Sequence, residues 1–178
     1  MSKKLVFNAK DVVGFSPAGY EDSYVSRLLI DPESVGSQRL VLNFFTLSPG
    51  KNTEPGSHPA PFDEIYYILR GRGILYLNAS RDTYNLESDT VAFIPSGTIH
   101  WLLNPGTTDL EMITIMPGPL AEGANPLYDD RKRRWGSSFK LAEKSGLESR
   151  TPLPVLRAEP PFGPSPTMST RARERVST

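Results

Sequence analysis

The sequence of 178 residues contains no cysteine and only two histidines. The absence of cysteine excludes disulfide bonds, thiolate metal ligands and cysteine nucleophiles. The 20 basic residues are balanced by 20 acidic residues, so the chain has no net charge to attract nucleic acid or an anionic membrane. No apolar run is long enough to cross a bilayer as a helix. Any ligating or catalytic chemistry must therefore use side chains other than thiols, and imidazole is available at only two positions.

The ends of the chain give no signal for export or for nucleic-acid binding. No apolar run that could form a signal peptide follows Met1–Lys4, so we expect a cytoplasmic protein. The basic run Arg131–Arg134 follows Asp129 and Asp130, which offset its charge, and no aromatic stacking platform is visible beside it. We therefore expect a solvated surface or a dimer contact there, and we expect neither nucleic acid nor a membrane as a partner.

Short apolar runs separated by turn residues fill the first two thirds of the chain. About nine such runs predict β-strands, at residues 5–7, 24–30, 38–47, 64–70, 74–77, 83–86, 91–94, 99–103 and 110–116. Short strands at even spacing are typical of an all-β sandwich or barrel. The run 64–70 ends at a Gly-Arg-Gly turn before 74–77, which predicts a hairpin.

The short apolar runs that predict strands stop after residue 118. We expect a β-barrel over residues 1–118 and a C-terminal extension over 119–150. In the extension, Ser137 or Ser138 is the expected N-cap of a short helix that ends at Gly146. Residues 151–178 contain six prolines and few large apolar groups, which predicts a flexible tail.

The two histidines stand at the ends of one stretch, with a carboxylate between them. His58 precedes the strand that begins at Glu64, and His100 lies in the first part of a later strand. Imidazole and carboxylate are common ligands of zinc, iron and nickel. A carboxylate and an imidazole inside a barrel are costly to bury unpaired, and a shared cation removes that cost. The sequence therefore predicts a metal site formed by His58, Glu64 and His100.

The same stretch resembles the two sequence motifs of the cupin superfamily. Seven positions match at the family spacing within residues 40–116: His58, Glu64 and Gly71 of the first motif, and Pro95, Gly97, His100 and Asn104 of the second. The resemblance implies a double-stranded β-helix, or jelly-roll barrel, with its motifs at residues 50–71 and 89–104. It also implies a homodimer, because in many cupins an N-terminal strand pairs with a second subunit.

The chain departs from the family motifs at three positions. Ala60 stands where the second histidine of His-x-His is expected, so the usual site of three histidines and one glutamate is reduced here to two histidines and one glutamate. Either this change weakens the site, or it opens room at the ion for a bidentate substrate, for water or for another protein ligand. Asn52 and Asp89 replace the first glycine of each motif, which we interpret as loop variation.

The expected cofactor is one divalent metal ion, with Fe(II) favoured and zinc, nickel or manganese as alternatives. Glu64 and Tyr66 are the candidate catalytic residues, because Tyr66 shares the inward face of the strand with Glu64. The predicted substrate pocket is lined by Asn43, Phe45, Tyr66, Phe93, Leu102, Met112 and Met116. This mostly apolar lining favours a small-molecule substrate with aromatic or aliphatic carbon.

Several functions remain open from the sequence. An enzyme is favoured, with a non-haem oxygenase slightly ahead because an open two-histidine site suits substrate and O₂ together. A non-redox isomerase, cyclase or lyase with zinc or nickel is the near alternative. A degenerate cupin that binds or senses a small molecule is a third interpretation. The fourth is a metal-free enzyme with His58 or His100 as base and Tyr66 as acid.

Overall fold

The computed structural model describes residues 5–78 and 81–142. The predicted tail at 151–178 and the predicted helix end at Gly146 lie outside the described residues. The described chain contains the 3₁₀ helix η1 (Ala9–Asp11), the α-helix α1 (Pro126–Trp135) and eight strands. The strands are β1 (Tyr24–Ile30), β2 (Leu40–Leu47), β3 (Glu64–Arg70), β4 (Gly73–Leu77), β5 (Asp82–Leu86), β6 (Val91–Ile94), β7 (His100–Leu103) and β8 (Leu110–Pro117).

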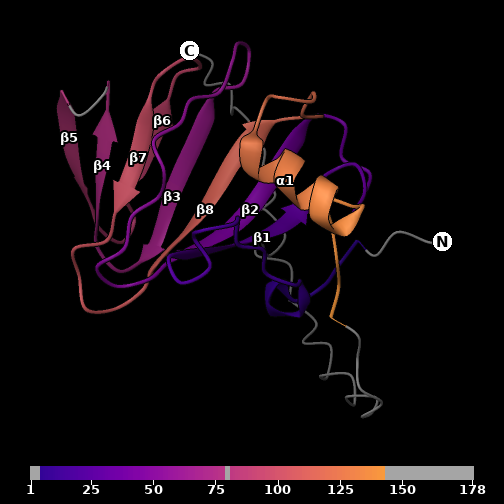
Figure 1. Cartoon of the computed structure of the whole chain (residues 1–178), viewed down its shortest axis with the longest axis horizontal. Helices are drawn as coiled ribbons and strands as arrows, with labels where there is room; N and C mark the ends of the chain where they lie inside the picture. Colours follow the sequence, from indigo (N-terminus) through magenta and orange to yellow (C-terminus); the bar gives the residue numbers. More distant parts are fainter. Residues whose placement is uncertain (1–4, 79–80, 143–178) are drawn as a thin grey trace, which may run out of the picture. The chain divides into compact units, whose positions relative to one another are not determined.

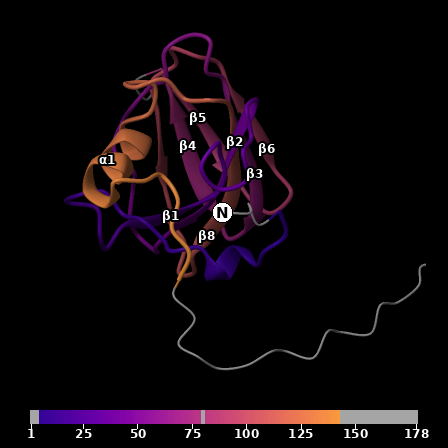
Figure 2. The same ribbon diagram turned by 90° about the vertical axis from the view of Figure 1, so that its right-hand side faces the viewer.

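The eight strands form two antiparallel sheets. One sheet has the order β1-β2-β8-β3-β6 and the other has the order β5-β4-β7, as can be followed in Figure 1. Figure 2 shows the same ribbon turned by 90°. The inner faces of both sheets contribute to one hydrophobic core cluster, which includes Phe45, Ile68, Leu75 and Leu102. The prediction of an all-β jelly roll is therefore confirmed. Among the described residues, no helix is long and apolar enough to span a membrane.

Side chains of β3 alternate between the core and the surface, as its sequence predicts. Glu64, Tyr66 and Ile68 are buried, whereas the intervening residues of the strand are exposed or nearly so. β8 shows the same alternation, with Met112 and Thr114 buried on the inner face. Since β3 pairs with β8 and Tyr66 lies opposite Thr114, the inner faces of the two strands form one continuous wall.

The predicted hairpin between β3 and β4 is wrong. β3 pairs with β6 and β8, whereas β4 pairs with β5 and β7, so the turn carries the chain from one sheet to the other. Gly71 occupies this corner with a φ of +87°, a left-handed conformation that disfavours other residues. The glycine signal for a turn was read correctly, but a local signal does not determine which strands become neighbours.

The predicted N-terminal strand at residues 5–7 does not form. Leu5 and Val6 are 74% and 86% exposed, and neither belongs to a sheet. Phe7 instead packs edge-on against Phe139, with ring centroids 6.1 Å apart. The described part of the chain therefore has eight strands rather than about nine. The homodimer expected from pairing of this strand stays a prediction.

The helix of the C-terminal extension lies earlier than predicted. α1 begins after Asn125, whose side chain accepts a hydrogen bond from the Tyr128 amide, and Pro126 occupies its first turn. Gly136, with a φ of +68°, ends the helix and donates its N–H to the Lys132 carbonyl. An Asn-Pro start and a glycine end are standard helix signals. They were overlooked because the charged run between them was read as exposed surface, and residues 138–142 form no helix.

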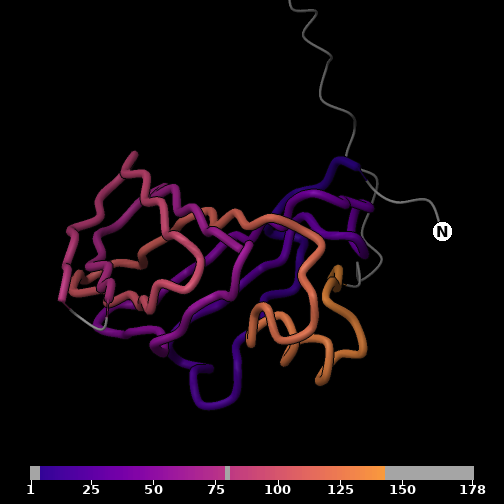
Figure 3. The backbone as a smooth tube through the Cα atoms, turned by 90° about the horizontal axis from the view of Figure 1, so that it is seen from above, coloured from indigo at the N-terminus to yellow at the C-terminus, as the bar shows by residue number. Residues whose placement is uncertain are grey.

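α1 covers the part of the large sheet that the small sheet leaves open. Tyr128 and Ala124 pack with Leu28, Val41 and Met116 in a second core cluster. β4 and β5 lie at the opposite end of the described region from α1 (Figures 1 and 3). The candidate site lies beside the first core cluster, several of whose members line its cavity, and next to residues 125–127 at the start of α1.

Candidate metal centre

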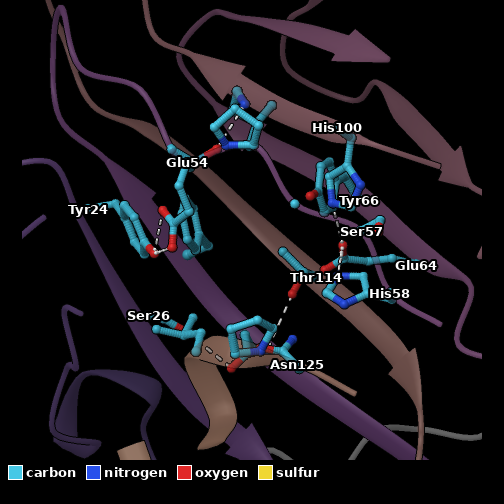
Figure 4. A pocket seen from close by; sticks show the side chains of 18 of the residues that line it. Tyr24, Ser26, Glu54, Ser57, His58, Glu64, Tyr66, His100, Thr114 and Asn125 are labelled. Carbon is cyan, nitrogen blue, oxygen red and sulfur yellow. Dashed lines mark hydrogen bonds and ion pairs between the residues drawn. The ribbon is translucent and has the colours of Figure 1, made fainter. Parts of the chain in front are cut away.

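Three side chains that can ligate a metal meet inside the barrel. One potential ligand atom from each of His58, Glu64 and His100 lies within 4.8 Å of the other two. Glu64 Oε2 is 3.2 Å from His58 Nε2 and 3.4 Å from His100 Nε2. Glu64 and His100 are 6% and 7% exposed, and His58 is partly buried. Figure 4 shows the three side chains directed toward one another.

Backbone pairing holds the three side chains in register. Glu64 is the first residue of β3 and His100 is the first residue of β7. The loop that carries His58 is joined to the segment before β7, since the Gly97 amide donates to the His58 carbonyl at 2.6 Å. Gly56 and His100 exchange two further backbone hydrogen bonds, at 2.8 and 3.0 Å. The loop histidine is therefore as firmly placed as the two strand residues.

Each histidine is oriented by a backbone carbonyl. His58 Nδ1 lies 3.1 Å from the Ala124 carbonyl, and His100 Nδ1 lies 2.9 Å from the Thr98 carbonyl. Because a carbonyl oxygen only accepts hydrogen bonds, each Nδ1 carries a hydrogen. In the neutral ring the Nε2 lone pair then faces Glu64, whereas in the protonated ring Nε2 donates a hydrogen bond to Glu64. Such support of metal-binding histidines fixes the tautomer and the ring orientation. Two lone pairs and a carboxylate thus point at one place, where a cation satisfies all three.

The electrostatics of the group favour a negative charge on Glu64. Burial raises the pKa of Glu64, but the hydrogen bonds from His100 and His58 outweigh it and lower the pKa to about 2. Burial lowers the pKa of His58, but its contacts with Glu64 and with the Ala124 carbonyl raise the pKa overall. A carboxylate that stays charged beside two imidazoles suits a divalent cation, so the residues present fit a metal with three protein ligands.

Position 60, where alanine replaces a possible ligand, lies away from the three candidate ligands. It is exposed, and it does not line the cavity beside the three ligands. Asp63, the neighbour of Glu64, accepts a hydrogen bond from the Ser96 amide at 2.9 Å and is not part of the ligand group. The candidate centre therefore has two imidazoles and one carboxylate, and all three residues line the cavity.

A cavity of about 160 Å³ adjoins the three side chains. Five of the residues predicted to line a pocket do so: Asn43, Phe45, Tyr66, Leu102 and Met112. Their role in binding substrate stays a prediction. Residues that the sequence did not indicate also line the cavity, namely Tyr24, Ser26, Thr53, Glu54, Thr114 and the segment 125–127.

Two residues predicted to line the pocket lie elsewhere. Phe93 is 58% exposed, because β6 directs Ile94 to the core and its neighbour Phe93 to the outer face. The side chain of Met116 is buried in the second core cluster, under α1. Both predictions are wrong. For Phe93, an apolar run of four residues does not reveal which of its two faces is buried. Met116 is on the buried face of β8, as alternation predicts, but it packs in the second core cluster and does not line the cavity.

Tyr66 lies beside the ligand group, as its place on β3 implies. It is 5% exposed, and its ring centroid is 6.3 Å from that of His100. Burial, and then the charge of Glu64, raise the pKa of Tyr66 well above its ordinary value. The phenol therefore stays neutral and can donate its hydrogen into the site. Its catalytic role stays a prediction.

A second polar group faces the cavity away from the three ligands. The Tyr24 hydroxyl donates to Glu54 and lies 2.9 and 3.0 Å from its two carboxylate oxygens. A polar row also crosses the cavity wall, where Ser26 donates to Asn43 at 3.2 Å and Asn43 donates to Thr114 at 3.3 Å. No motif marks these residues, although the inward face of β1 could have indicated Tyr24.

The last residue of the second motif is structural. Asn104 is fully buried, donates to the carbonyls of Leu47 and Thr108, and accepts from the Gly106 amide. It does not line the cavity. Its hydrogen bonds close the turn after β7 and tie that turn to β2, which supports the strand that carries His100.

Comparisons with known proteins agree with this geometry. A family model described as a cupin domain matches residues 43–116. The chain is 31% identical over 88 residues to the oxalate-binding protein of Thermotoga maritima, which covers 49% of this chain and 70% of that protein. It is 28% identical over 96 residues to the tetracenomycin polyketide synthase protein TcmJ of Streptomyces glaucescens, covering 54% of this chain and 62% of the relative.

A solved structure supports the fold. The polyketide cyclase RemF from Streptomyces resistomycificus matches with a TM-score of 0.56 and 22% identity, over 74% of this chain and 93% of that chain. The two motifs, the two-sheet barrel and the matches to cupin sequences and structures together establish that this chain belongs to the cupin superfamily.

Proposed function

We propose that this protein is a metal-dependent cupin enzyme that acts on a small organic molecule by Lewis-acid and acid–base chemistry. The observation that carries the proposal is the convergence of the His58 and His100 lone pairs and the Glu64 carboxylate beside a cavity. A divalent metal bound there would polarise oxygen atoms of the substrate. The chain itself would orient the substrate and transfer protons.

Two hydroxyl groups of the cavity wall support proton transfer. Tyr66 is a neutral phenol beside the ligands, so it can donate a proton or a hydrogen bond to a substrate oxygen as negative charge develops there. Thr114 lies opposite Tyr66 on the adjacent strand and can orient the same group. Enolisation, cyclisation and isomerisation of oxygenated substrates require such donors, and the cyclase RemF shares the fold.

The size of the cavity restricts the substrate. A protein cavity of about 150 Å³ accommodates a molecule the size of benzene. The cavity of about 160 Å³ therefore suits a single ring or a short chain rather than a fused polycyclic molecule. Phe45, Leu102 and Met112 give one part of it an apolar surface, which favours carbon over a fully hydroxylated sugar.

A non-haem oxygenase is the second candidate. It is favoured by the small number of protein ligands, because two imidazoles and one carboxylate leave positions for substrate and O₂ on Fe(II). Only the oxygenase consumes O₂, so the two candidates differ in whether turnover requires O₂.

Metal content tests the proposal directly. The full chain, purified without chelator or added metal, is expected to carry about one divalent metal ion, measured by elemental analysis. His58→Ala and His100→Ala should each lose it, whereas the matched control Glu87→Gln, at an exposed position, should retain it. A wild-type protein without metal that also fails to bind added zinc, iron, nickel or manganese would refute the proposal. Turnover that continues without O₂ would favour the acid–base enzyme, and turnover that stops would favour the oxygenase.

A further inference from the structure

Glu54 and Tyr24 form a polar pair on the far side of the cavity from the candidate metal ligands. Figure 4 shows Tyr24 and Glu54 on one side of the pocket, and His58, Glu64 and His100 on the other. Tyr24 comes from β1 and is 3% exposed, whereas Glu54 comes from the loop before β3 and is half-buried. Both side chains line the cavity, so a small ligand beside the metal centre also meets this pair.

The Glu54 carboxylate has capacity that the protein does not use. A carboxylate accepts about four hydrogen bonds, and the Tyr24 hydroxyl supplies one hydrogen. Among the described residues, no lysine or arginine lines the cavity and no ion pair includes Glu54. Burial, and then the charge of Glu54, raise the pKa of Tyr24 well above its ordinary value, so the phenol remains a donor and holds the carboxylate in place.

The two ends of the cavity therefore differ in charge. A divalent cation on the Glu64 side would give that end a net positive charge, whereas the Glu54 end is negative and partly screened from water. A ligand that fits both ends carries an anionic oxygen group at one end and a hydrogen-bond donor at the other. A dicarboxylate fits poorly, because its second carboxylate would face Glu54 and repel it.

We propose that Glu54, positioned by Tyr24, binds a hydroxyl or ammonium group of the substrate, and that the protein thereby selects small carboxylates or enolates with a donor at the far end. This proposal rests on the proposed function, because it assigns the anionic end of the substrate to the metal centre. The proposal therefore predicts that this protein binds a simple dicarboxylate such as oxalate weakly.

Calorimetric titration of the metal-loaded full chain tests the selectivity. The probes are carboxylates that differ only in the group at the far end: butyrate (methyl series), γ-hydroxybutyrate (hydroxyl series), γ-aminobutyrate (ammonium series) and succinate (succinate series). Shorter and longer members of each series are titrated as well. We expect the hydroxyl or the ammonium series to bind about fivefold or more tightly than the methyl series, the gain of one net hydrogen bond. The succinate series should bind most weakly. Which donor binds better distinguishes the two chemistries.

Glu54→Gln should remove the preference. In this variant the ammonium and methyl series should bind with similar affinity, and the succinate series should gain affinity because the repelling charge is absent. Glu87→Gln, at an exposed position outside the cavity, should behave as wild type. An unchanged ranking in Glu54→Gln, a wild-type preference for the methyl series, or no binding of any probe would each overturn the proposal.

Tyr24→Phe tests the positioning role. It keeps the ring that stacks on Phe45 at 4.8 Å and removes only the hydroxyl that orients Glu54. We expect an intermediate donor preference with unchanged metal content. A purely structural role for the hydroxyl would lower the thermal midpoint and leave the donor preference intact, which would contradict the assignment.

A titration of the metal-free protein tests the Glu54 site independently of the proposed metalloenzyme. n-Butylamine carries only the donor end, so metal-free wild type should bind it more tightly than metal-free Glu54→Gln, as measured by NMR chemical shifts. A protein that binds no metal but retains this difference would refute the metalloenzyme and keep the Glu54 site. Equal shifts in the two proteins would refute the Glu54 site, whatever the metal content.

Discussion

Replacing Gly71 with alanine should destabilise the protein far more than the same change at Gly97. Both glycines have left-handed φ angles, +87° and +80°, so each alanine incurs a similar backbone cost of about 1 kcal/mol. They differ in their surroundings. A Cβ at Gly71 would overlap the Asp109 carbonyl oxygen and lie 2.9 Å from Leu110 Cα, whereas a Cβ at Gly97 has no neighbour within 4 Å.

The neighbours of Gly71 are backbone atoms at the start of β8, so they cannot rotate away. Overpacking of this kind costs about 1–3 kcal/mol on top of the conformational term. We therefore expect Gly71→Ala to lose about 2–4 kcal/mol and Gly97→Ala about 1 kcal/mol of unfolding free energy, measured by urea denaturation. In a chain of this size these losses correspond to midpoint decreases of about 10 °C and about 3 °C.

The comparison also tests the architecture. Gly71 forms the corner between β3, which carries Glu64, and β4, which pairs with the His100 strand β7. If β3 and β4 instead formed the hairpin that the sequence suggested, the close contact between Gly71 and Asp109 would not exist. Equal destabilisation by the two alanines would therefore refute the two-sheet corner at this position.

Three further changes have defined outcomes. Ala60→His should alter metal affinity less than about twofold in competition titrations, because residue 60 is exposed outside the cavity; tightening beyond tenfold would mean that the loop delivers a fourth ligand. Asn125→Ala should lose about 1 kcal/mol of unfolding free energy with the N-cap of α1, and no loss in urea denaturation would contradict that role. Glu33→Gln should lose about 1 kcal/mol at neutral pH, a figure reduced for exposure of Glu33 to solvent. Burial opposes the charge of Glu33, but hydrogen bonds from Ser137 and Ser138 lower its pKa from 4.5 to about 2. The stabilisation is therefore present above pH 4.5 and lost as the pH falls toward 2, so a wild-type advantage that is independent of pH in unfolding titrations would exclude this mechanism.

The ligand group was predictable because its signals are local and regular. The spacing of His58, Glu64 and His100 follows two short motifs, and the alternation of faces along β3 fixes Tyr66 on the same side as Glu64. The bounds of β1 and β3 also follow from apolar runs that end at turn residues. The strand bounds and faces depend on a few consecutive residues, whereas the meeting of His58 with His100 follows from the spacing of the two motifs and their resemblance to the cupin family.

Features that depend on distant segments were missed or misread. The partner strands of β3 are chosen by packing across the barrel, which a glycine turn does not reveal. Tyr24 and Glu54 are separated by 30 positions and meet only because β1 and the loop before β3 face one cavity. The helix α1 was missed for a different reason. Its Asn-Pro start and its glycine end are local signals, but the charged residues between them were given more weight.

The residues of the site divide into two groups by their place in the chain. All three candidate ligands lie within residues 43–116, the span matched by the cupin model. Tyr24 and the wall residues Asn125, Pro126 and Leu127 lie outside that span. Changes in the outer segments should therefore alter which ligand fits, while the three candidate metal ligands themselves belong to the barrel.

Ala124 joins the two groups. Its carbonyl lies outside the matched span, yet it orients the His58 ring and so determines which nitrogen faces Glu64. The carbonyl is held in place by the turn before α1, where the Ala124 amide donates to Ala121 and the Asn125 side chain caps the helix. A loss of this turn would release His58 to rotate without any change in the cupin motifs. The C-terminal extension thus supports the candidate metal centre, and a barrel shortened to residues 1–118 should bind a divalent metal more weakly than the full chain even where it folds.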